Sequence, residues 1–150
     1  MRTMLTATFL AIGLGCSWFG GGSAVHLQSG PQAPAAQGEV KTKLTKDGNT
    51  TVTVTVKHLA PPDRLARDAT TYVVWAHPLG TPAGAGAASG GPADGGFFNL
   101  GGLKIDGDLN GDLTTTTPYH SFDLLITPEP SAAVTKPTNN RALWATVTHD

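Results

Sequence analysis

The stretch of sequence with the clearest chemical potential is an acidic loop in the second half of the chain. Asp106, Asp108, Asn110 and Asp112 place side-chain oxygens at alternating positions, and a glycine follows Asn110. Ca²⁺ needs six to eight oxygen ligands and a chain that curls around it, which this spacing would supply. The twelfth position, where a Ca²⁺ loop carries a bidentate carboxylate, is Thr117. The competing interpretation is a hairpin turn, because Asp, Asn and Gly tolerate the left-handed backbone conformation.

Other residues with catalytic or metal-binding potential are isolated. The histidines show none of the short spacings of metal sites, so the fold would have to assemble a zinc or copper site from His58, His77 and His120. There is no G-x-S-x-G or S-x-x-K motif for a nucleophile. We therefore expect no enzyme, no catalytic residues and no cofactor other than Ca²⁺ at the acidic loop. The five histidines are His26, His58, His77, His120 and His149.

The first residues of the chain resemble an export signal. A positive start is followed by an apolar run of about 11 residues, too short for a ~30 Å hydrocarbon core, and then by small residues. Two endings compete. A signal peptide over 1–24 would be cleaved before Val25. Alternatively, 1–15 would be a lipoprotein signal with Cys16, the single cysteine, as the lipidated mature N-terminus. The imperfect lipobox has Gly13 where leucine is usual.

The segment 20–37 is rich in Gly, Ala, Pro and Gln, which predicts a flexible linker between a lipid and a folded domain over 39–150. The expected location is extracytoplasmic, on the cell membrane or outer membrane through Cys16, and otherwise periplasmic or secreted. The formal net charge is −1 with no run of Lys or Arg, so we expect no nucleic-acid partner. The expected partners are the membrane, through the lipid, and another envelope protein.

The folded part shows the period-two alternation of strands. Valines alternate with threonines after the turn at Asp47-Gly48-Asn49, which predicts a hairpin with one buried face. The aromatic residues Tyr72, Trp75, Phe97, Phe98, Phe122 and Trp144 are expected in the core rather than on a stacking surface. A Gly/Ala-rich stretch over 79–96 is expected as a loop. About seven short strands are predicted, over 39–46, 50–59, 70–76, 97–105, 113–117, 121–127 and 141–148. This pattern is typical of an all-β, immunoglobulin-like β-sandwich.

The order of aromatic and proline landmarks over residues 70–147 resembles the extracytoplasmic C-terminal β-sandwich domain of anti-sigma-K-type regulators. The residues that carry the resemblance are Tyr72-Val73-Val74-Trp75, Gly95-Gly96-Phe97, Leu100-Gly101, Leu125-Ile126-Thr127-Pro128-Glu129-Pro130 and Pro137-Thr138. The resemblance implies a sandwich on the outer side of a membrane. It does not imply sigma-factor binding, because that family's cytoplasmic sigma-binding domain and membrane helix have no counterpart here.

Three functions compete at this point. The first is a non-enzymatic cell-envelope module with a binding or structural role, lipid-anchored through Cys16. The second is a Ca²⁺- or metal-responsive binding protein that uses the loop from Asp106 to Asp112. The third is a hydrolase whose site forms only in three dimensions, which would require titratable side chains converging in a deep pocket.

Overall fold

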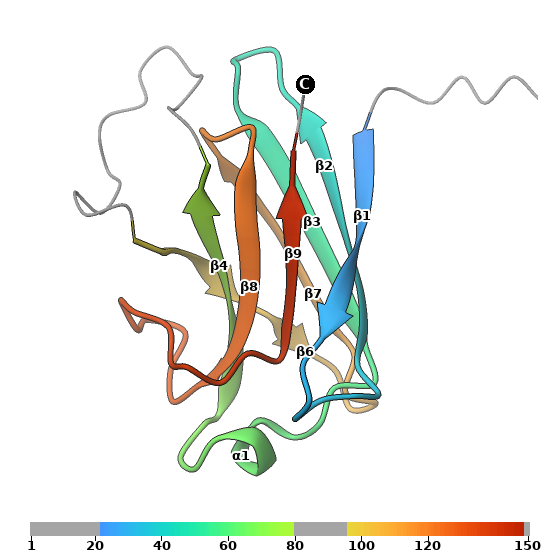
Figure 1. Ribbon diagram of the computed structural model, residues 1–150, viewed down its shortest axis with the longest axis vertical. Helices are drawn as coiled ribbons and strands as arrows, with labels where there is room; N and C mark the ends of the chain where they lie inside the picture. The colour runs from blue at the N-terminus through green and yellow to red at the C-terminus, as the bar shows by residue number, and fades with distance from the viewer. Residues whose placement is uncertain (1–21, 80–95, 149–150) are drawn as a thin grey trace, which may run out of the picture.

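The computed structural model describes residues 22–79 and 96–148 as an all-β protein with one short helix (Figure 1). Within these residues, no helix is both long enough and apolar enough to cross a membrane. The signal segment with Cys16, nearly all of the Gly/Ala-rich stretch over 79–96 and His149 lie outside the described residues.

Nine antiparallel strands form a single sheet with the order β5-β4-β8-β9-β1-β2-β3-β7-β6. The sheet is nearly closed, because β5 at one end of this order lies against β7 near the other end. The elements are β1 (Gly22–Ser29), β2 (Gln37–Leu44), β3 (Thr50–Lys57), α1 (Pro62–Leu65), β4 (Thr71–Pro78), β5 (Phe98–Gly102), β6 (Lys104–Ile105), β7 (Gly111–Thr117), β8 (Phe122–Glu129) and β9 (Leu143–Val147).

Strand β1 joins the two halves of the sheet. Its residues from Gly22 to Leu27 pair with β2, while Gln28 and Ser29 pair with β9. One half therefore contains β6, β7, β3 and β2, and the other contains β9, β8, β4 and β5. Figure 1 shows β4, β8 and β9 in front of β3 and β7, with β1 at one side.

The core lies between the two halves. Because successive side chains on a strand point to opposite faces, alternate residues of each half contribute to it. The hydrophobic residues of this cluster with 0% exposure are Val40, Val52, Val54 and Val56 from β2 and β3, and Tyr72, Val74, Ala76, Phe122, Ile126, Ala142, Leu143 and Val147 from the other half. The valines of β3, which alternate with threonines, thus face the core as predicted.

The segment 20–37, expected as a flexible linker, instead contains β1 over its described part. Val25 pairs with Val40 and Leu27 is buried. The turn after β1 also buries Ala33 and Ala36, with Ala33 N–H donating to the carbonyl of Gly30. The prediction was wrong because the Gly/Ala/Pro composition is typical of linkers and the alternation within β1 is weak. The strand forms by pairing with β2 and β9.

The strand expected over 97–105 divides into two. Leu103 leaves the ladder, buries its side chain and donates its N–H to the carbonyl of Tyr72 at 2.8 Å. Gly101 adopts φ +129°, a conformation that other residues rarely adopt. As a result β5 pairs with β4, while β6 pairs with β7 in the other half. The division of this strand into β5 and β6 adds one strand to the predicted seven, and β1 adds another, which gives the nine strands of the sheet.

Candidate functional site

A second apolar cluster lies on the outer face of β4 and β8, opposite the core. Val73, Trp75 and Leu125 are buried there, with Phe97 and Trp144 partly buried against them. The same strands also supply Val74 and Leu124 to the core, so both of their faces carry apolar residues. Burial of the outer face is incomplete, which distinguishes it from the core.

The strand register arranges the outer face in two adjacent rows. Trp75 pairs with Leu125, and Leu125 pairs with Trp144, which forms an apolar row across β4, β8 and β9. In the next row Asp123 lies between His77 and Thr146. Side chains directly opposite each other on one face lie close enough to interact. An apolar strip therefore runs beside a polar one.

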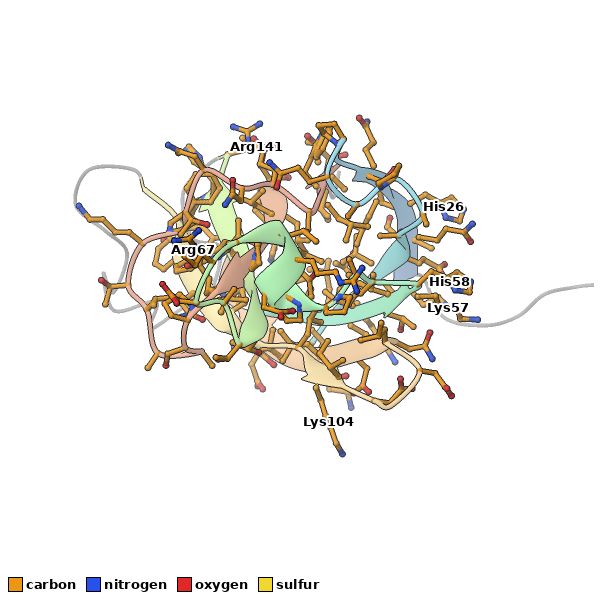
Figure 2. The ribbon with its side chains drawn as sticks, turned by 90° about the horizontal axis from the view of Figure 1, so that it is seen from below. His26, Lys57, His58, Arg67, Lys104 and Arg141 are labelled. Atoms are coloured by element: carbon orange, nitrogen blue, oxygen red, sulfur yellow. The ribbon has the colours of Figure 1, made fainter. Side chains whose placement is uncertain are left out.

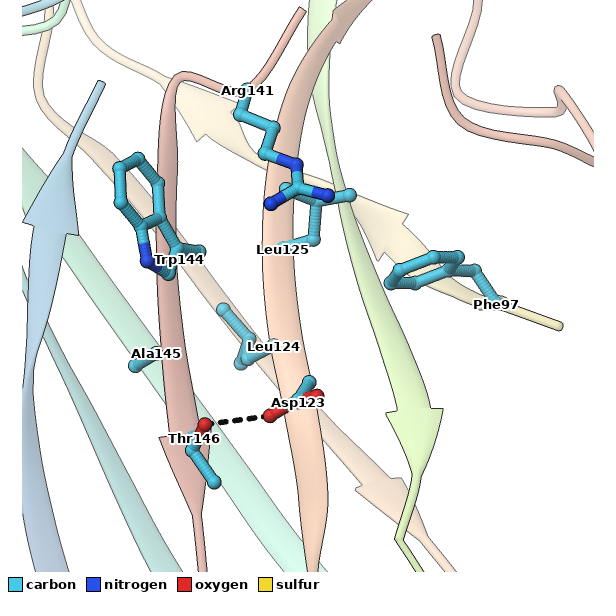
Figure 3. Close-up of a pocket in the computed structure, with 8 residues that line it drawn as sticks. All are labelled: Phe97, Asp123, Leu124, Leu125, Arg141, Trp144, Ala145 and Thr146. Atoms are coloured by element: carbon cyan, nitrogen blue, oxygen red, sulfur yellow. Dashed lines mark hydrogen bonds between the residues drawn. The ribbon is translucent and has the colours of Figure 1, made fainter. Parts of the chain in front are cut away.

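A hollow of about 190 Å³ opens along these two rows. Figure 3 shows Trp144 on one side, Phe97 on the other and Leu125 between them. Phe97 precedes β5 and its ring lies 5.3 Å from the ring of His77, centre to centre. The lining residues are Phe97, Asp123, Leu124, Leu125, Arg141, Trp144, Ala145 and Thr146. We call this hollow the outer groove.

Three polar groups border the outer groove. Asp123 Oδ1 accepts a hydrogen bond of 2.6 Å from the Thr146 hydroxyl, drawn in Figure 3. Within residues 22–79 and 96–148, neither Asp123 Oδ2, the Arg141 guanidinium nor the Trp144 indole N–H has a protein partner. The groove thus presents an acceptor and donors beside aromatic surfaces, with Thr146 fixing the orientation of the carboxylate.

A buried hydrogen-bond network holds the outer face and the segment leading to Arg141. Trp75 Nε1 donates to the Thr127 hydroxyl at 2.9 Å, and this hydroxyl donates to Glu129. Glu129 is 1% exposed, and its Oε1 also accepts from the backbone N–H of Thr138 at 2.8 Å. Since buried polar groups are costly when unpaired, this network fixes the connection between β8 and β9.

The acidic loop forms the turn of the hairpin between β6 and β7. Asp106 Oδ1 accepts from the backbone N–H groups of Asp108 and Asn110, each at 2.9 Å, and Oδ2 accepts from the Asn110 side chain at 3.1 Å. Hydrogen bonds from Asn110, chiefly from its backbone, hold the pKa of Asp106 below its ordinary value. Leu109 takes the left-handed conformation at φ 60°, and Asp112 lies in β7.

The candidate metal-binding residues do not converge. Throughout the described part of the chain, no three His, Cys, Asp or Glu side chains lie close enough to share a metal ion. His120 Nε2 lies 3.0 Å from the carbonyl of Gly48, His77 contacts Phe97, and His58 has φ 57° after β3. Figure 2 shows basic side chains, His26 and His58 among them, around the periphery from Arg141 at the top to Lys104 at the bottom.

The aromatic residues divide differently from the prediction. Tyr72 and Phe122 lie in the core as expected, and Phe98 packs against it. Trp75, Phe97 and Trp144 belong instead to the outer face, where Phe97 and Trp144 border the groove. Alternation alone could not assign Trp75 to a face, since β4 and β8 are apolar on both faces. The signal that could have identified Trp144 is the alternation in β9, where Leu143 and Ala145 face the core and Trp144 shares its side of the strand with Thr146.

No protein-family model and no curated protein sequence matches this chain.

Proposed function

We propose that this chain is a non-enzymatic binding module of the cell envelope, exported and lipid-anchored through Cys16, which holds its ligand in the outer groove. The observation that carries the proposal is the pair of partly buried rings, Phe97 and Trp144, on an apolar cluster separate from the core. Exposed apolar surface bordered by polar residues is characteristic of interaction sites. Trp is also among the residues most enriched at binding hot spots.

The architecture proposed for the module is an immunoglobulin-like β-sandwich of the kind found outside the membrane in anti-sigma-K-type regulators. Two findings support it. The two halves of the sheet pack their inner faces on one core, and β1 passes from one half to the other. The disulfide of antibody domains has no counterpart within this chain, because the sequence has a single cysteine.

The pairing of β1 favours the ending at Cys16 over cleavage before Val25. Gly22, Ser23 and Ala24 pair with Lys43, Thr42 and Lys41 of β2. Cleavage before Val25 would remove these residues and shorten β1, whereas a mature N-terminus at Cys16 leaves the strand whole. Mass spectrometry of the mature protein tests this: a lipidated Cys16 is expected, and an N-terminus at Val25 would overturn the anchor.

The chemistry of the outer groove supports binding rather than hydrolysis. Asp123 is the single carboxylate among the described residues that line it, and its partner is a threonine hydroxyl. Hydrolysis of a glycosidic bond in the usual way requires two carboxyl groups. Activation of a hydroxyl as a nucleophile requires a positioned base such as histidine. The Thr146 hydroxyl instead donates a hydrogen bond to the Asp123 carboxylate.

The binding function is tested by sedimentation with isolated cell envelopes of the host. The purified chain carries Cys16→Ser, so that no lipid can bring it into the pellet. We expect retention by the envelopes, and at least about tenfold weaker retention for Trp144→Ala, as hot-spot truncation produces. Leu44→Ala is the matched control, because Leu44 is 42% exposed and lies on β2, away from the groove. Equal retention of Trp144→Ala and the parent chain, or none of either, would refute the proposal.

A further inference from the structure

We infer that the ligand of the outer groove is an uncharged saccharide, one sugar ring of which lies between the side chains of Trp144 and Phe97. This inference rests on the binding function proposed above and names the chemistry of the ligand. Three features of the groove point to such a ligand: the aromatic residues on its two sides (Figure 3), the polar groups without protein partners at its border, and its open shape.

The aromatic residues suit a flat ligand with apolar faces. Trp144 lies on β9 and Phe97 packs over β4, so β8 separates them, with Leu125 as the floor. Neighbouring strands lie about 4.8 Å apart, which places β9 and β4 about 10 Å apart. The face of an aromatic ring carries partial negative charge and attracts C–H groups, which carry partial positive charge. A sugar ring exposes such C–H groups on its faces and its hydroxyls around its edge.

The polar border requires a ligand that both donates and accepts. Asp123 Oδ2 is an acceptor, while the Arg141 guanidinium and the Trp144 indole N–H are donors, and none has a protein partner within the residues that the structure describes. Each sugar hydroxyl both donates and accepts hydrogen bonds, so the hydroxyls of one ring can bond to the acceptor and to the donors of the border. An anion would be attracted by Arg141 but repelled by Asp123, and a cation the reverse, so neither sign of net charge suits both groups, which favours an uncharged ligand.

A proline-rich peptide is the other ligand class that aromatic grooves commonly bind, because its polyproline conformation is formed in advance. Proline has no backbone N–H, so such a peptide offers carbonyl acceptors and few donors. Covering Asp123 with such a peptide would leave the free carboxylate oxygen desolvated and unpaired, which is unfavourable. The groove is therefore better matched to hydroxyls than to prolines.

The shape of the groove is consistent with one unit of an oligosaccharide. Its volume of about 190 Å³ leaves room for a group much larger than one water molecule. The hollow lies on an outer sheet face instead of inside a barrel, so a longer chain can extend beyond it along the strands. Only the unit between the rings would be stacked.

The direct test is titration of the full Cys16→Ser chain with the uncharged oligosaccharides cellohexaose, xylohexaose and chitohexaose, with decaproline as the peptide probe. Binding is followed by acrylamide quenching of tryptophan fluorescence. The sequence has three tryptophans, and both Trp18 and the fully buried Trp75 are retained in Trp144→Ala. The difference in quenching between the parent chain and Trp144→Ala therefore gives the signal from the groove. We expect at least one saccharide to protect Trp144, and Asp123→Ala to weaken its binding about tenfold, as loss of a charge-assisted hydrogen bond does. Leu44→Ala should leave the affinity unchanged.

A second measurement separates this inference from the proposed function. Envelopes are treated with periodate, which cleaves vicinal diols, or with protease, before the sedimentation assay. Loss of Trp144-dependent retention after periodate, but not after protease, supports a saccharide. Loss after protease alone, or binding of decaproline and none of the saccharides, overturns the saccharide while the binding function stands. Absence of retention on untreated envelopes, together with no binding to any saccharide, overturns both.

Discussion

The Tyr72 hydroxyl provides a quantitative test of the structure. Tyr72 lies on β4 with its side chain fully buried in the core, and its hydroxyl donates to the carbonyl of Ala60 at 2.7 Å. Burial, followed by the negative charge of Asp63, raises the pKa of Tyr72 from 10.0 to about 12. Folding therefore keeps this phenol protonated at a pH where an exposed tyrosine is already ionised.

The sign of the effect follows from proton linkage. Between pH 10 and 12 the folded state holds the proton that the unfolded state loses, so stability decreases as the pH rises. A pKa difference of about two units corresponds to a loss of about 1.4 kcal/mol at pH 11 and at most about 2.7 kcal/mol above pH 12. Below pH 9 the hydroxyl contributes its hydrogen bond, about 1 kcal/mol.

The assay is urea unfolding of the parent chain and of Tyr72→Phe at pH 8, 10 and 11. We expect the variant to be less stable by about 1 kcal/mol at pH 8 and to match or exceed the parent chain near pH 11. When both chains also carry Asp63→Asn, the pH at which Tyr72→Phe becomes as stable as its parent should be higher. The reason is that removing the negative charge of Asp63 lowers the pKa of Tyr72. A free-energy difference that stays constant from pH 8 to 11 would refute the placement of Tyr72 in the core.

Three further predictions address the segments around the outer groove and the acidic loop. A Cβ at Gly30 would overlap the backbone carbonyl of Arg141, so Gly30→Ala should cost about 1–3 kcal/mol in urea unfolding. Gly107→Ala, which meets open space, should change stability by less than about 0.5 kcal/mol. Glu129→Ala removes the acceptor of the buried Thr127 hydroxyl and of the Thr138 backbone N–H, and it should cost about 2–4 kcal/mol, with faster amide exchange before β9; unchanged exchange there would contradict its positioning role. Asp106→Ala should lower thermal stability at pH 7, and this difference should shrink as the pH falls below the ordinary carboxyl range, because the lowered pKa stabilises the fold only while Asp106 is ionised.

The strand content could be predicted from the sequence because one-sided alternation is a local signal. In β3 the valines alternate with threonines, so Val52, Val54 and Val56 could be assigned to the core before any pairing was known. The acidic turn is similarly local, since its hydrogen bonds join residues no more than four apart. By contrast, β1 has few apolar residues and acquires its conformation from pairing with β2 and β9.

The outer groove could not be predicted in the same way. Trp75, Leu125 and Trp144 are separated by tens of residues, and they form one row only through the registers of β4 with β8 and of β8 with β9. A shift of one residue in either register would send these side chains to the opposite face. The sequence by itself determined that the chain is all-β and which face of β3 is buried. The tertiary structure decided which aromatic residues fill the core and which remain at the surface, because strands that are apolar on both faces carry no local signal for the choice.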